Sequence, residues 1–489
     1  MTSPLSWENR VAYPPFGAFA YVPDRVLVRA DNPSPELDRA LDIITELTAG
    51  NPDPQEPAAG YQVIFVGDVE IPQLVEALRA EGFDAQPDHV LFSDRRRVDE
   101  DDGELTANPF SGNQFSGNPF SGNPFSGNPF SGNPFSGNPF SGNPFSGNPF
   151  SGNPFSGNPG LGYPYPKPQF AGPRGRTYAK TGRGRSTARP TPSPWQSAAW
   201  PAVAGPPVVT VLDVALPAGN LPSVLSNCLA PTGAAAYAGP DEDGDGFLDR
   251  VAGHGMFVAG IVAQVDPQAV IEVVPAMGNL GIADESVVAR ILDGLVGRTS
   301  IVNMSFSGYA MHRMGCLARA VRRFQFLPQG YPNPQRPASG RDGGVVVASA
   351  GNDGTWWAPY PAILPGVVSV AALGPDGPAP FTNWGPWVRA CAAGVDVRSA
   401  FFLPESWTVT VHGVAVQKEG NEPPTPEGDP DLFEGAALWS GTSFAAPLVA
   451  GKLARLVREG PMKPKEAVRQ LIEAPSLAGL PWLGTIVTA

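Results

Sequence analysis

The chain has 489 residues, a formal net charge of -13 and a sequence isoelectric point of about 4.9. This length predicts two or three domains joined by linkers, and the 42% of hydrophobic residues supply a buried core. The acidic balance argues against a nucleic-acid-binding protein, because phosphate contacts need clustered Lys and Arg. Three cysteines are too few for a disulfide framework, and no pair has metal-site spacing.

Neither a secretory signal nor a membrane span is recognisable. Glu8, Arg10 and several prolines interrupt the apolar residues near the N-terminus, where a signal peptide has an unbroken apolar core. No run reaches the roughly 18 apolar residues of a membrane span. We therefore expect a cytoplasmic, soluble protein, with release by a non-standard route left open.

The first region, residues 1–95, has the composition of a small α/β domain. Apolar spacing predicts helices at 34–48 and 71–81 and strands at 25–30, 61–66 and 90–93. This order of elements predicts a small sheet with helices on one face.

The second region, residues 96–200, is predicted to be a disordered linker. From Asn108 the unit NPFSG repeats ten times, with Gln114 in place of one Pro. Its period of five fits neither helix nor strand, and its Pro and Gly oppose both. A flexible spacer is one interpretation, and a self-associating tract with regularly spaced aromatics is the other. The basic run from Arg174 to Arg189 fits a solvated linker, a contact to an acidic partner or a maturation site.

The third region, residues 201–489, alternates strand-like and helical runs. Strands are predicted at 208–212, 270–274, 301–305, 345–348 and 367–371, and helices at 254–264, 285–296, 311–324 and 443–458. This alternation predicts an α/β fold with a mostly parallel sheet and helices on both faces. Ligands of such folds bind beyond the carboxyl ends of the strands.

Four polar residues stand at predicted strand ends or helix starts. Asp213 ends the strand VVTVLD, and His254 lies in GHGMFVAG. Asn352 follows a strand in SAGND, and Ser443 opens a helix in SGTSFAAP. Each alone has an ordinary structural explanation, such as a helix cap. Together they supply the nucleophile, base, orienting carboxylate and oxyanion donor of acyl transfer by serine, in the chain order Asp, His, Ser.

These motifs, with NMSFSG between them, resemble those of the subtilase family of serine endopeptidases. The resemblance covers about 280 residues and implies a subtilisin-like three-layer fold and cleavage of protein or peptide substrates. It implies Ser443 as nucleophile, His254 as base, Asp213 as its orienting partner and Asn352 as oxyanion donor, with no cofactor required for the chemistry.

The resemblance also implies that residues 305–308 (Ser305, Phe306, Ser307 and Gly308) pair with the substrate backbone, and Phe306 hints at apolar selectivity. Two positions depart from the family pattern. Val214 follows the Asp where many members have Ser or Thr, which could change the hydrogen bonds to Asp213. Met256 follows the His-Gly pair where many members have Thr.

The acidic segment DEDGDGFLD places carboxylates at alternate positions around glycines. Such a segment suits calcium, although the twelfth position of an EF-hand, normally Glu, is Ala252. A structural calcium site and a solvated acidic loop both remain open. The candidate ligands are Asp241, Asp243, Asp245 and Asp249.

The first region resembles the inhibitory propeptide of many subtilases, best over YVPDRVLVR at residues 21–29. The resemblance implies that this domain is an intramolecular inhibitor, and an unrelated small binding domain is the alternative. Three hypotheses follow for the whole chain: an active endopeptidase restrained by its N-terminal domain, a non-catalytic peptide-binding module, or a protein whose NPFSG tract tethers it to others.

Overall fold

The computed structural model describes residues 19–30, 33–48, 50–67, 69–93, 187–199, 203, 205–217, 219–229, 248–279, 281–326, 343–403, 433–460, 462–474 and 478–488. The NPFSG tract, most of the basic run and the acidic residues 241–245 lie outside these ranges, so the predictions made for them stay predictions.

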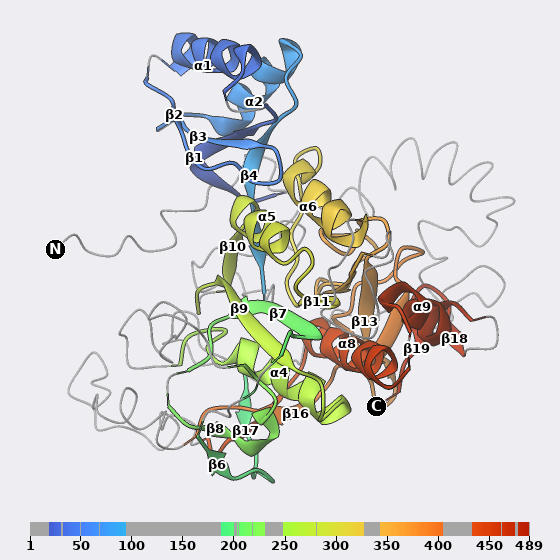
Figure 1. The fold of residues 1–489 in the computed structure, drawn as a ribbon. Helices are drawn as coiled ribbons and strands as arrows, with labels where there is room; N and C mark the ends of the chain where they lie inside the picture. The colour runs from blue at the N-terminus through green and yellow to red at the C-terminus, as the bar shows by residue number, and fades with distance from the viewer. Residues whose placement is uncertain are drawn as a thin grey trace, which may run out of the picture.

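The first region folds into a small sheet with two helices on one face (Figure 1). Its sheet is antiparallel and has the order β10-β4-β1-β3-β2. Apolar residues of the helices, such as Leu37, Ile44 and Leu78, form its core. The elements are β1 (Tyr21–Val28), α1 (Pro35–Thr48), β2 (Asp53–Pro54), β3 (Gln62–Phe65), α2 (Ile71–Ala80) and β4 (Ala85–Phe92).

Strand β4 is longer than the predicted strand at 90–93. All eight of its residues are buried, including the polar residues Gln86, Asp88 and His89. These polar residues interrupt the apolar pattern, so the first half of the strand could not be predicted from that pattern. They are buried because β4 lies against the large domain, where each finds a polar partner.

The large domain is built on a nine-stranded, mostly parallel sheet, which confirms the predicted α/β fold. Its main order is β18-β19-β15-β13-β12-β11-β7-β9, with β14 paired to β13. The strands are β7 (Val209–Val214), β9 (Ile271–Met277), β11 (Ile301–Met304), β12 (Val345–Ser349), β13 (Val368–Gly374), β14 (Gly377–Pro378), β15 (Ala390–Ala393), β18 (Gly479–Leu480) and β19 (Gly484–Ile486).

Alternate residues of the strands feed two separate cores, which gives the domain its three layers. Val345 and Val347 of β12 point into a core shared with α4 (His254–Val265) and α8 (Thr442–Glu459). Val346 and Ala348 point the other way, into a core shared with α5 (Glu285–Gly294) and α6 (Gly315–Phe326). Burial on both faces explains why these strands read as continuous apolar runs.

The helix expected at 311–324 begins at Gly315 instead. The amides of Met311 and Gly315 donate to side chains of the first region, His89 Nε2 at 3.3 Å and Gln86 Oε1 at 2.7 Å. These long-range hydrogen bonds replace the first helical turn, and no local sequence pattern encodes them.

Short elements join the remaining chain to the large domain. The stretch 187–199, within the predicted linker, contributes β5 (Arg189–Pro190) and β6 (Ser197–Ala198). Strand β5 pairs with β17 (Ala436–Trp439), which in turn pairs with β16 (Val397–Ala400), and β6 pairs with β8 (Leu221–Pro222). Near the C-terminus, α9 (Pro464–Val468) follows α8.

The first region docks on α5, α6 and β10 (Ile282–Asp284) of the large domain (Figure 1). Leu27, Tyr61 and Leu91 of the first region share one apolar cluster with Val288 and Leu317 of the two helices. Strand β10 continues the small sheet beyond β4. The two regions are thus joined by a common core and by backbone pairing.

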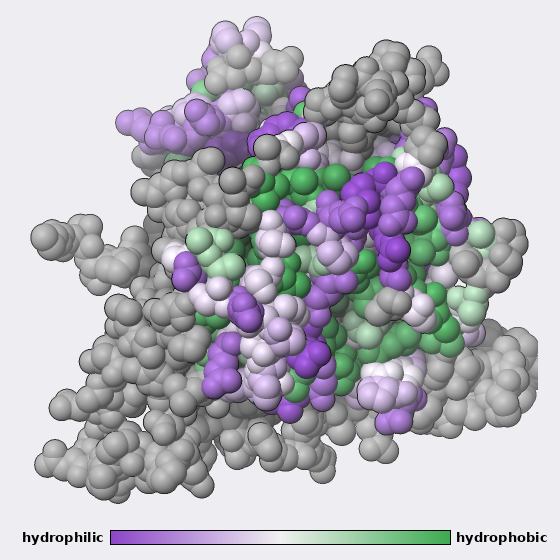
Figure 2. Space-filling view, turned by 60° about the horizontal axis from the view of Figure 1, so that its bottom comes forward, coloured by the Kyte–Doolittle hydropathy of each residue, from purple (hydrophilic) through white to green (hydrophobic). Residues whose placement is uncertain are grey.

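The surface is mixed in polarity. Figure 2 shows apolar areas exposed between bands of polar residues on one face. Folded proteins normally expose much apolar area, so this alone marks no site. Within the described ranges, no helix combines the length and apolar character needed to cross a bilayer.

Candidate active site

Asp213 lies near the carboxyl end of β7 and is fully buried. Its Oδ1 accepts the Val214 amide at 2.8 Å and lies 2.7 Å from His254 Nδ1, while Oδ2 lies 2.9 Å from the same nitrogen. A carboxylate only accepts, so Nδ1 carries the proton and Nε2 is left as a base. Val214 therefore supplies a backbone donor to Asp213, although the family's usual hydroxyl residue is missing.

His254 begins α4 between two glycines that nothing larger could replace. Gly253 has a φ of 75°, and a Cβ there would lie 2.7 Å from the Phe401 ring. A Cβ on Gly255 would lie 2.3 Å from the Val214 carbonyl oxygen. The GHG motif thus lets α4 approach the end of β7 closely enough for the His254–Asp213 contact.

Ser443 lies in the first turn of α8, where backbone amides point out of the helix end. Pro447, four residues later, has no N–H to donate to the Ser443 carbonyl. The Ser305 hydroxyl donates to that carbonyl instead, at 2.8 Å. Asn303 Nδ2 in turn donates to the Ser305 hydroxyl at 2.9 Å. The NMSFSG motif therefore holds the start of α8 in place.

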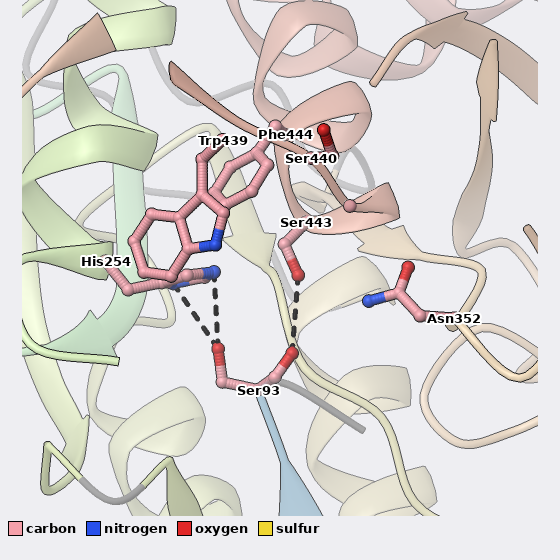
Figure 3. Close-up of a pocket in the computed structure, with 8 residues that line it drawn as sticks. Ser93, His254, Asn352, Trp439, Ser440, Ser443 and Phe444 are labelled. Atoms are coloured by element: carbon pink, nitrogen blue, oxygen red, sulfur yellow. Dashed lines mark hydrogen bonds between the residues drawn. The ribbon is translucent and has the colours of Figure 1, made fainter. Parts of the chain in front are cut away.

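Asn352 points its amide nitrogen toward Ser443 (Figure 3). Its Oδ1 accepts the Thr442 amide at 2.9 Å and the Thr442 hydroxyl at 2.8 Å. Because the backbone N–H can only donate, the atom that it meets must be Oδ1, which turns Nδ2 into the pocket. The Gly351 amide donates to the same Thr442 hydroxyl at 3.1 Å. Thr442 is thus a positioning residue for Asn352, a role that the sequence analysis missed because a Thr at the start of a helix is commonly a cap.

Aromatic rings enclose His254. Trp439 meets it edge-on at a centroid distance of 5.3 Å, and Phe444 lies at 5.2 Å. Phe257, one of the residues after the GHG motif, packs on Phe444 at 4.6 Å. These rings exclude water from one side of the imidazole and hold its plane. Among the described residues, His254, Asn352, Trp439, Ser443 and Phe444 all line one pocket.

Ser93, the residue after β4, enters this pocket from the first region (Figure 3). Its hydroxyl lies 3.3 Å from His254 Nε2, and its carbonyl oxygen accepts the Ser443 hydroxyl at 3.4 Å. The Ser443 hydroxyl also donates to the Ser305 carbonyl, at 3.2 Å. Ser443 is therefore bonded to these carbonyls rather than to His254, with Ser93 between the two.

The chain entering the pocket pairs with the large domain on both sides. Phe92 and Ser307 exchange two backbone hydrogen bonds of 2.8 Å, and the Ser93 amide donates to the Gly281 carbonyl at 2.9 Å. Gly308 has no space for a Cβ, which would lie 2.7 Å from the Val90 carbonyl. Of the predicted substrate-binding residues, Ser305 and Ser307 contact this chain.

Phe306 lies elsewhere. Its side chain is fully buried in the core beneath α5 and α6. The same apolar cluster contains Leu91 of the first region, so Phe306 is buried while that region is docked, and the suggestion that it confers apolar selectivity stays a prediction.

A second buried network joins β4 to the helix side of the large domain. His89 Nδ1 lies 2.7 Å from Glu285 Oε2, and both side chains are fully buried. Glu285 also accepts Gln86 Nε2 at 2.8 Å and the Leu317 amide at 2.9 Å. The bonds from His89 and Gln86 exist only while the first region is docked, whereas the Leu317 bond lies within the large domain.

Asp88 extends this network. It accepts the Ser286 amide at 3.0 Å and hydroxyl at 2.7 Å, and it lies 3.1 Å from Arg25 Nη1. Burial and the nearby Asp284 charge raise the pKa of Asp88 to about 7, against the opposing effects of Arg25 and the Ser286 bonds. Arg25 also lies 3.0 Å from Asp284.

The structure places only part of the predicted calcium loop. Asp249 is buried, whereas Asp241, Asp243 and Asp245 lie outside the described residues. The part of the chain that can be inspected brings together no group of three His, Cys, Asp or Glu suited to a metal. Calcium therefore stays a prediction of the sequence.

The three cysteines are free and buried. Burial raises the pKa of Cys228 and of Cys391 to about 12 and raises that of Cys316 well above its ordinary value. These thiols stay protonated near neutral pH and are inert as nucleophiles.

Comparison with known proteins decides the family. Residues 226–478, just over half of the chain, match the subtilase family Peptidase_S8. The chain belongs to the subtilase family. This finding confirms the resemblance drawn from the motifs and places the chain among subtilisin-like serine proteases. The matched range contains His254, Asn352 and Ser443, while Asp213 precedes it.

Curated relatives share parts of this subtilase. It is 36% identical over 132 residues to the thermophilic serine proteinase of Bacillus sp. strain AK1, covering 27% of this chain and 25% of that one. It is 26% identical over 245 residues to the thermostable alkaline protease of Halalkalibacterium halodurans, covering 46% of this chain and 55% of that one. The chain thus matches about a quarter and about half of their lengths.

Among solved structures, a cold-adapted subtilisin-like serine proteinase aligns at 19% identity with a TM-score of 0.40. The alignment covers 57% of this chain and 87% of that one.

Proposed function

We propose that this subtilase is a serine endopeptidase whose catalytic triad is Asp213, His254 and Ser443. The observation that carries the proposal is the buried Asp213–His254 contact, which directs His254 Nε2 into a pocket lined also by Ser443 and Asn352. Subtilase membership independently supports serine endopeptidase chemistry.

The geometry supports the following steps. Ser443 Oγ attacks the carbonyl carbon of the scissile peptide while His254 Nε2 takes its proton, and Asp213 stabilises the imidazolium. Asn352 Nδ2 and the Ser443 amide donate to the oxyanion. Collapse of the tetrahedral adduct breaks the C–N bond, and His254 gives its proton to the leaving amine. Water, activated by His254, then hydrolyses the acyl-enzyme and restores the Ser443 hydroxyl.

Substrates are proposed to be extended polypeptides bound through their backbone. The segment ending at Ser93 shows how such a chain fits, with Ser307 on one side and the Gly281 carbonyl on the other. Pairing of this kind tolerates many sequences, because it uses main-chain groups.

We further propose that the first region restrains the enzyme by occupying its cleft. Ser93 lies where a substrate must lie, and its carbonyl accepts the nucleophile's hydroxyl. The shared core around Tyr61 and Leu91 and the His89–Glu285 network hold this segment in place. An inhibitor must both occupy the cleft and be held there, and this interface does both. An unrelated binding domain would not explain why Ser93 occupies the cleft.

We propose that the first self-cleavage lies next to Ser93. The Ser93 carbonyl oxygen accepts the Ser443 hydroxyl at 3.4 Å, which supports a cut in this part of the chain. The bond cut is therefore the one after Ser93 or the one following it, before the basic run and the NPFSG tract.

The test compares the full chain with Ser443→Ala and, as a matched serine control, Ser197→Ala on an edge strand. Each is incubated and followed by intact mass and by cleavage of a denatured protein. We expect the wild type and the control to release a fragment ending at residue 93 or 94 and to degrade the substrate. Turnover that survives Ser443→Ala would refute the triad, and an inert wild type that still binds peptide tightly would favour the non-catalytic module.

A structural calcium ion at Asp241, Asp243, Asp245 and Asp249 is a separate proposal, which plays no part in the chemical steps. Chelation should lower the Tm of the Ser443→Ala chain, and Asp243→Asn should abolish that effect. An unchanged Tm would leave these residues as a solvated acidic loop.

A further inference from the structure

Five of the ten tryptophans in the chain lie on one part of the large domain. Trp387 Nε1 donates to the Trp356 carbonyl at 3.1 Å, and the Gly385 amide donates to the Trp482 carbonyl at 2.9 Å. These bonds bring together the loop after β12, the loop before β15 and the β18–β19 turn. We call this surface the tryptophan face; it consists of Trp356, Trp357, Trp384, Trp387 and Trp482.

The tryptophan face is open to solvent. Trp356, Trp357 and Trp482 are 50%, 41% and 47% exposed, and they make up half of the large hydrophobic side chains exposed in the described ranges. The rings of Trp356 and Trp357 stack at a centroid distance of 5.0 Å. Indole rings normally contribute by burial, so an exposed cluster of them indicates a binding surface.

The chain itself carries a ligand of matching chemistry. Residues 108–157 contain ten Phe side chains spaced five residues apart and no charged residue. Gly in every unit, and Pro in nine of the ten, oppose a helical or sheet core built from these rings. The tract therefore offers ten equivalent aromatic groups on a neutral backbone.

The chain that precedes this tract starts near the tryptophan face. Trp356 follows Asn352 by four residues, at most about 14 Å along the chain. Asn352 and Ser93 line the same pocket, and the first NPFSG unit begins 15 residues after Ser93. A fully extended chain of that length spans at most about 50 Å, so the length of chain allows the first repeats to reach the face.

The chain after the tract is joined to the large domain from residue 187 onward. The Thr187 hydroxyl accepts Trp439 Nε1 at 2.8 Å, and Arg189 pairs with Leu438 in the β5–β17 ladder. The tract consequently stays attached to the catalytic domain even when the chain is cut next to Ser93.

We propose that the tryptophan face binds Phe side chains of the NPFSG tract. One aromatic pair contributes about 0.5–1.5 kcal/mol beyond its buried area, so a single unit binds weakly. Ten units on a tethered chain raise the effective concentration to the millimolar range, which makes weak docking persistent. The docked tract belongs to the same molecule, because tethering favours it over a second copy, and the inference does not depend on protease activity.

The binding test uses the full Ser443→Ala chain with all ten repeat Phe changed to Ala, so that the face has no internal ligand. The probe is a synthetic peptide of four NPFSG units, and its control is the same peptide with Ala in place of Phe. Titration calorimetry should detect binding of the Phe peptide only. Trp356→Ala with Trp357→Ala should weaken binding about tenfold or more, from the loss of two aromatic pairs.

Leu47→Ala is the matched surface control, since Leu47 is 56% exposed on the first region, and it should leave binding unchanged. Trp482→Ala provides a second variant in a separate turn, should the double variant fold poorly. No binding at millimolar peptide, equal binding of the Ala peptide, or binding that survives removal of the tryptophans would overturn the proposal. The last of these outcomes would place the peptide in the catalytic cleft.

Sedimentation of the Ser443→Ala chain with its native tract then distinguishes the two arrangements. Concentration-dependent association that disappears on changing the ten Phe to Ala indicates docking between copies. A monomer that becomes less compact after the same change indicates docking within one chain.

Discussion

The molecule contains two buried histidine–carboxylate pairs with the same nitrogen–oxygen distance. One lies in the candidate active site, and the other joins β4 of the first region to the large domain. His254 Nδ1 to Asp213 and His89 Nδ1 to Glu285 are both 2.7 Å, and all four side chains are nearly or fully buried. The pairs differ at the second nitrogen. His254 Nε2 faces the pocket, whereas His89 Nε2 accepts the Met311 amide. A carboxylate partner alone does not make a base; an open second nitrogen does.

The largest expected effect is the difference in kcat between variants of the two carboxylates. Asp213→Asn should lower kcat by about 10³–10⁴, because the imidazole loses the partner that fixes its tautomer. Glu285→Gln should leave kcat of the cleaved, mature enzyme within about twofold, since Glu285 contacts no reacting atom. Steady-state kinetics on a small peptide substrate measure both, and equal losses would contradict the division of roles.

The next effect concerns Asn352, the proposed oxyanion donor. Asn352→Ala should lower kcat by about 10²–10³, the loss given for this donor in subtilisin itself. Thr442→Val removes the hydroxyl that holds Asn352 Oδ1 and should cost about tenfold in kcat with little change in KM. Thr442→Ser should restore the rate. A rise in KM without a fall in kcat would argue against a role of Thr442 in positioning Asn352.

A third effect tests docking. His89→Gln breaks a buried pair, which should weaken retention of the first region about 10²-fold or more. His312→Gln is the matched control: His312 contacts Glu76 across the same interface at the same 2.7 Å, but the side chains are 34% and 55% exposed. Exposed pairs contribute little, so this variant should resemble the wild type.

The readout for docking is the delay between self-cleavage, followed by mass, and the appearance of peptidase activity. His89→Gln should shorten this delay, and His312→Gln should not. Similar delays in all three proteins would show that the apolar core around Tyr61 and Leu91 holds the domain by itself.

The smallest effect is a pH dependence. Asp88 has a pKa of about 7 in the folded chain against an ordinary value of 3.8. Below about pH 4 its carboxyl is protonated in both the folded and unfolded chain. Between about pH 4 and 7 only the unfolded chain loses the proton, so the stability that depends on Asp88 falls as pH rises.

Thermal unfolding in the Ser443→Ala background checks this sign. Between pH 4 and pH 7, the Tm of Asp88→Asn should rise relative to the Tm of its parent. Above pH 7 the difference between the two Tm values should stay constant. Asp53→Asn, on the exposed β2, should keep the slope of the parent. A slope of opposite sign would mean that Arg25 and Ser286 outweigh burial at Asp88.

Much of the large domain could be predicted from local pattern. Strands such as β12 are continuous apolar runs because both faces are buried, and the GHG and SGTS motifs carry small residues that close packing requires. The fold class, the family and the four candidate residues followed from these features.

Other features were beyond local pattern because their partners lie far away in the sequence. Strand β4 keeps polar residues buried only because Glu285 and Ser286 of the large domain bond to them. The start of α6 at Gly315 depends on Gln86, more than two hundred residues earlier. Phe306 is buried in a cluster that also contains Leu91 of the first region, a contact that no local pattern around Phe306 could predict.

The sequence by itself determined the chemistry available to this subtilase, since motif spacing places a carboxylate, an imidazole, a hydroxyl and an amide at the ends of regular elements. Only the tertiary structure decided how these groups are arranged and what covers them. It places Ser93 between His254 and Ser443, and it orients the Asn352 side chain through a hydrogen bond from Thr442. It also joins the first region to α5 and α6. The reason is physical: apolar periodicity is local, whereas the satisfaction of buried polar groups depends on which distant segments meet.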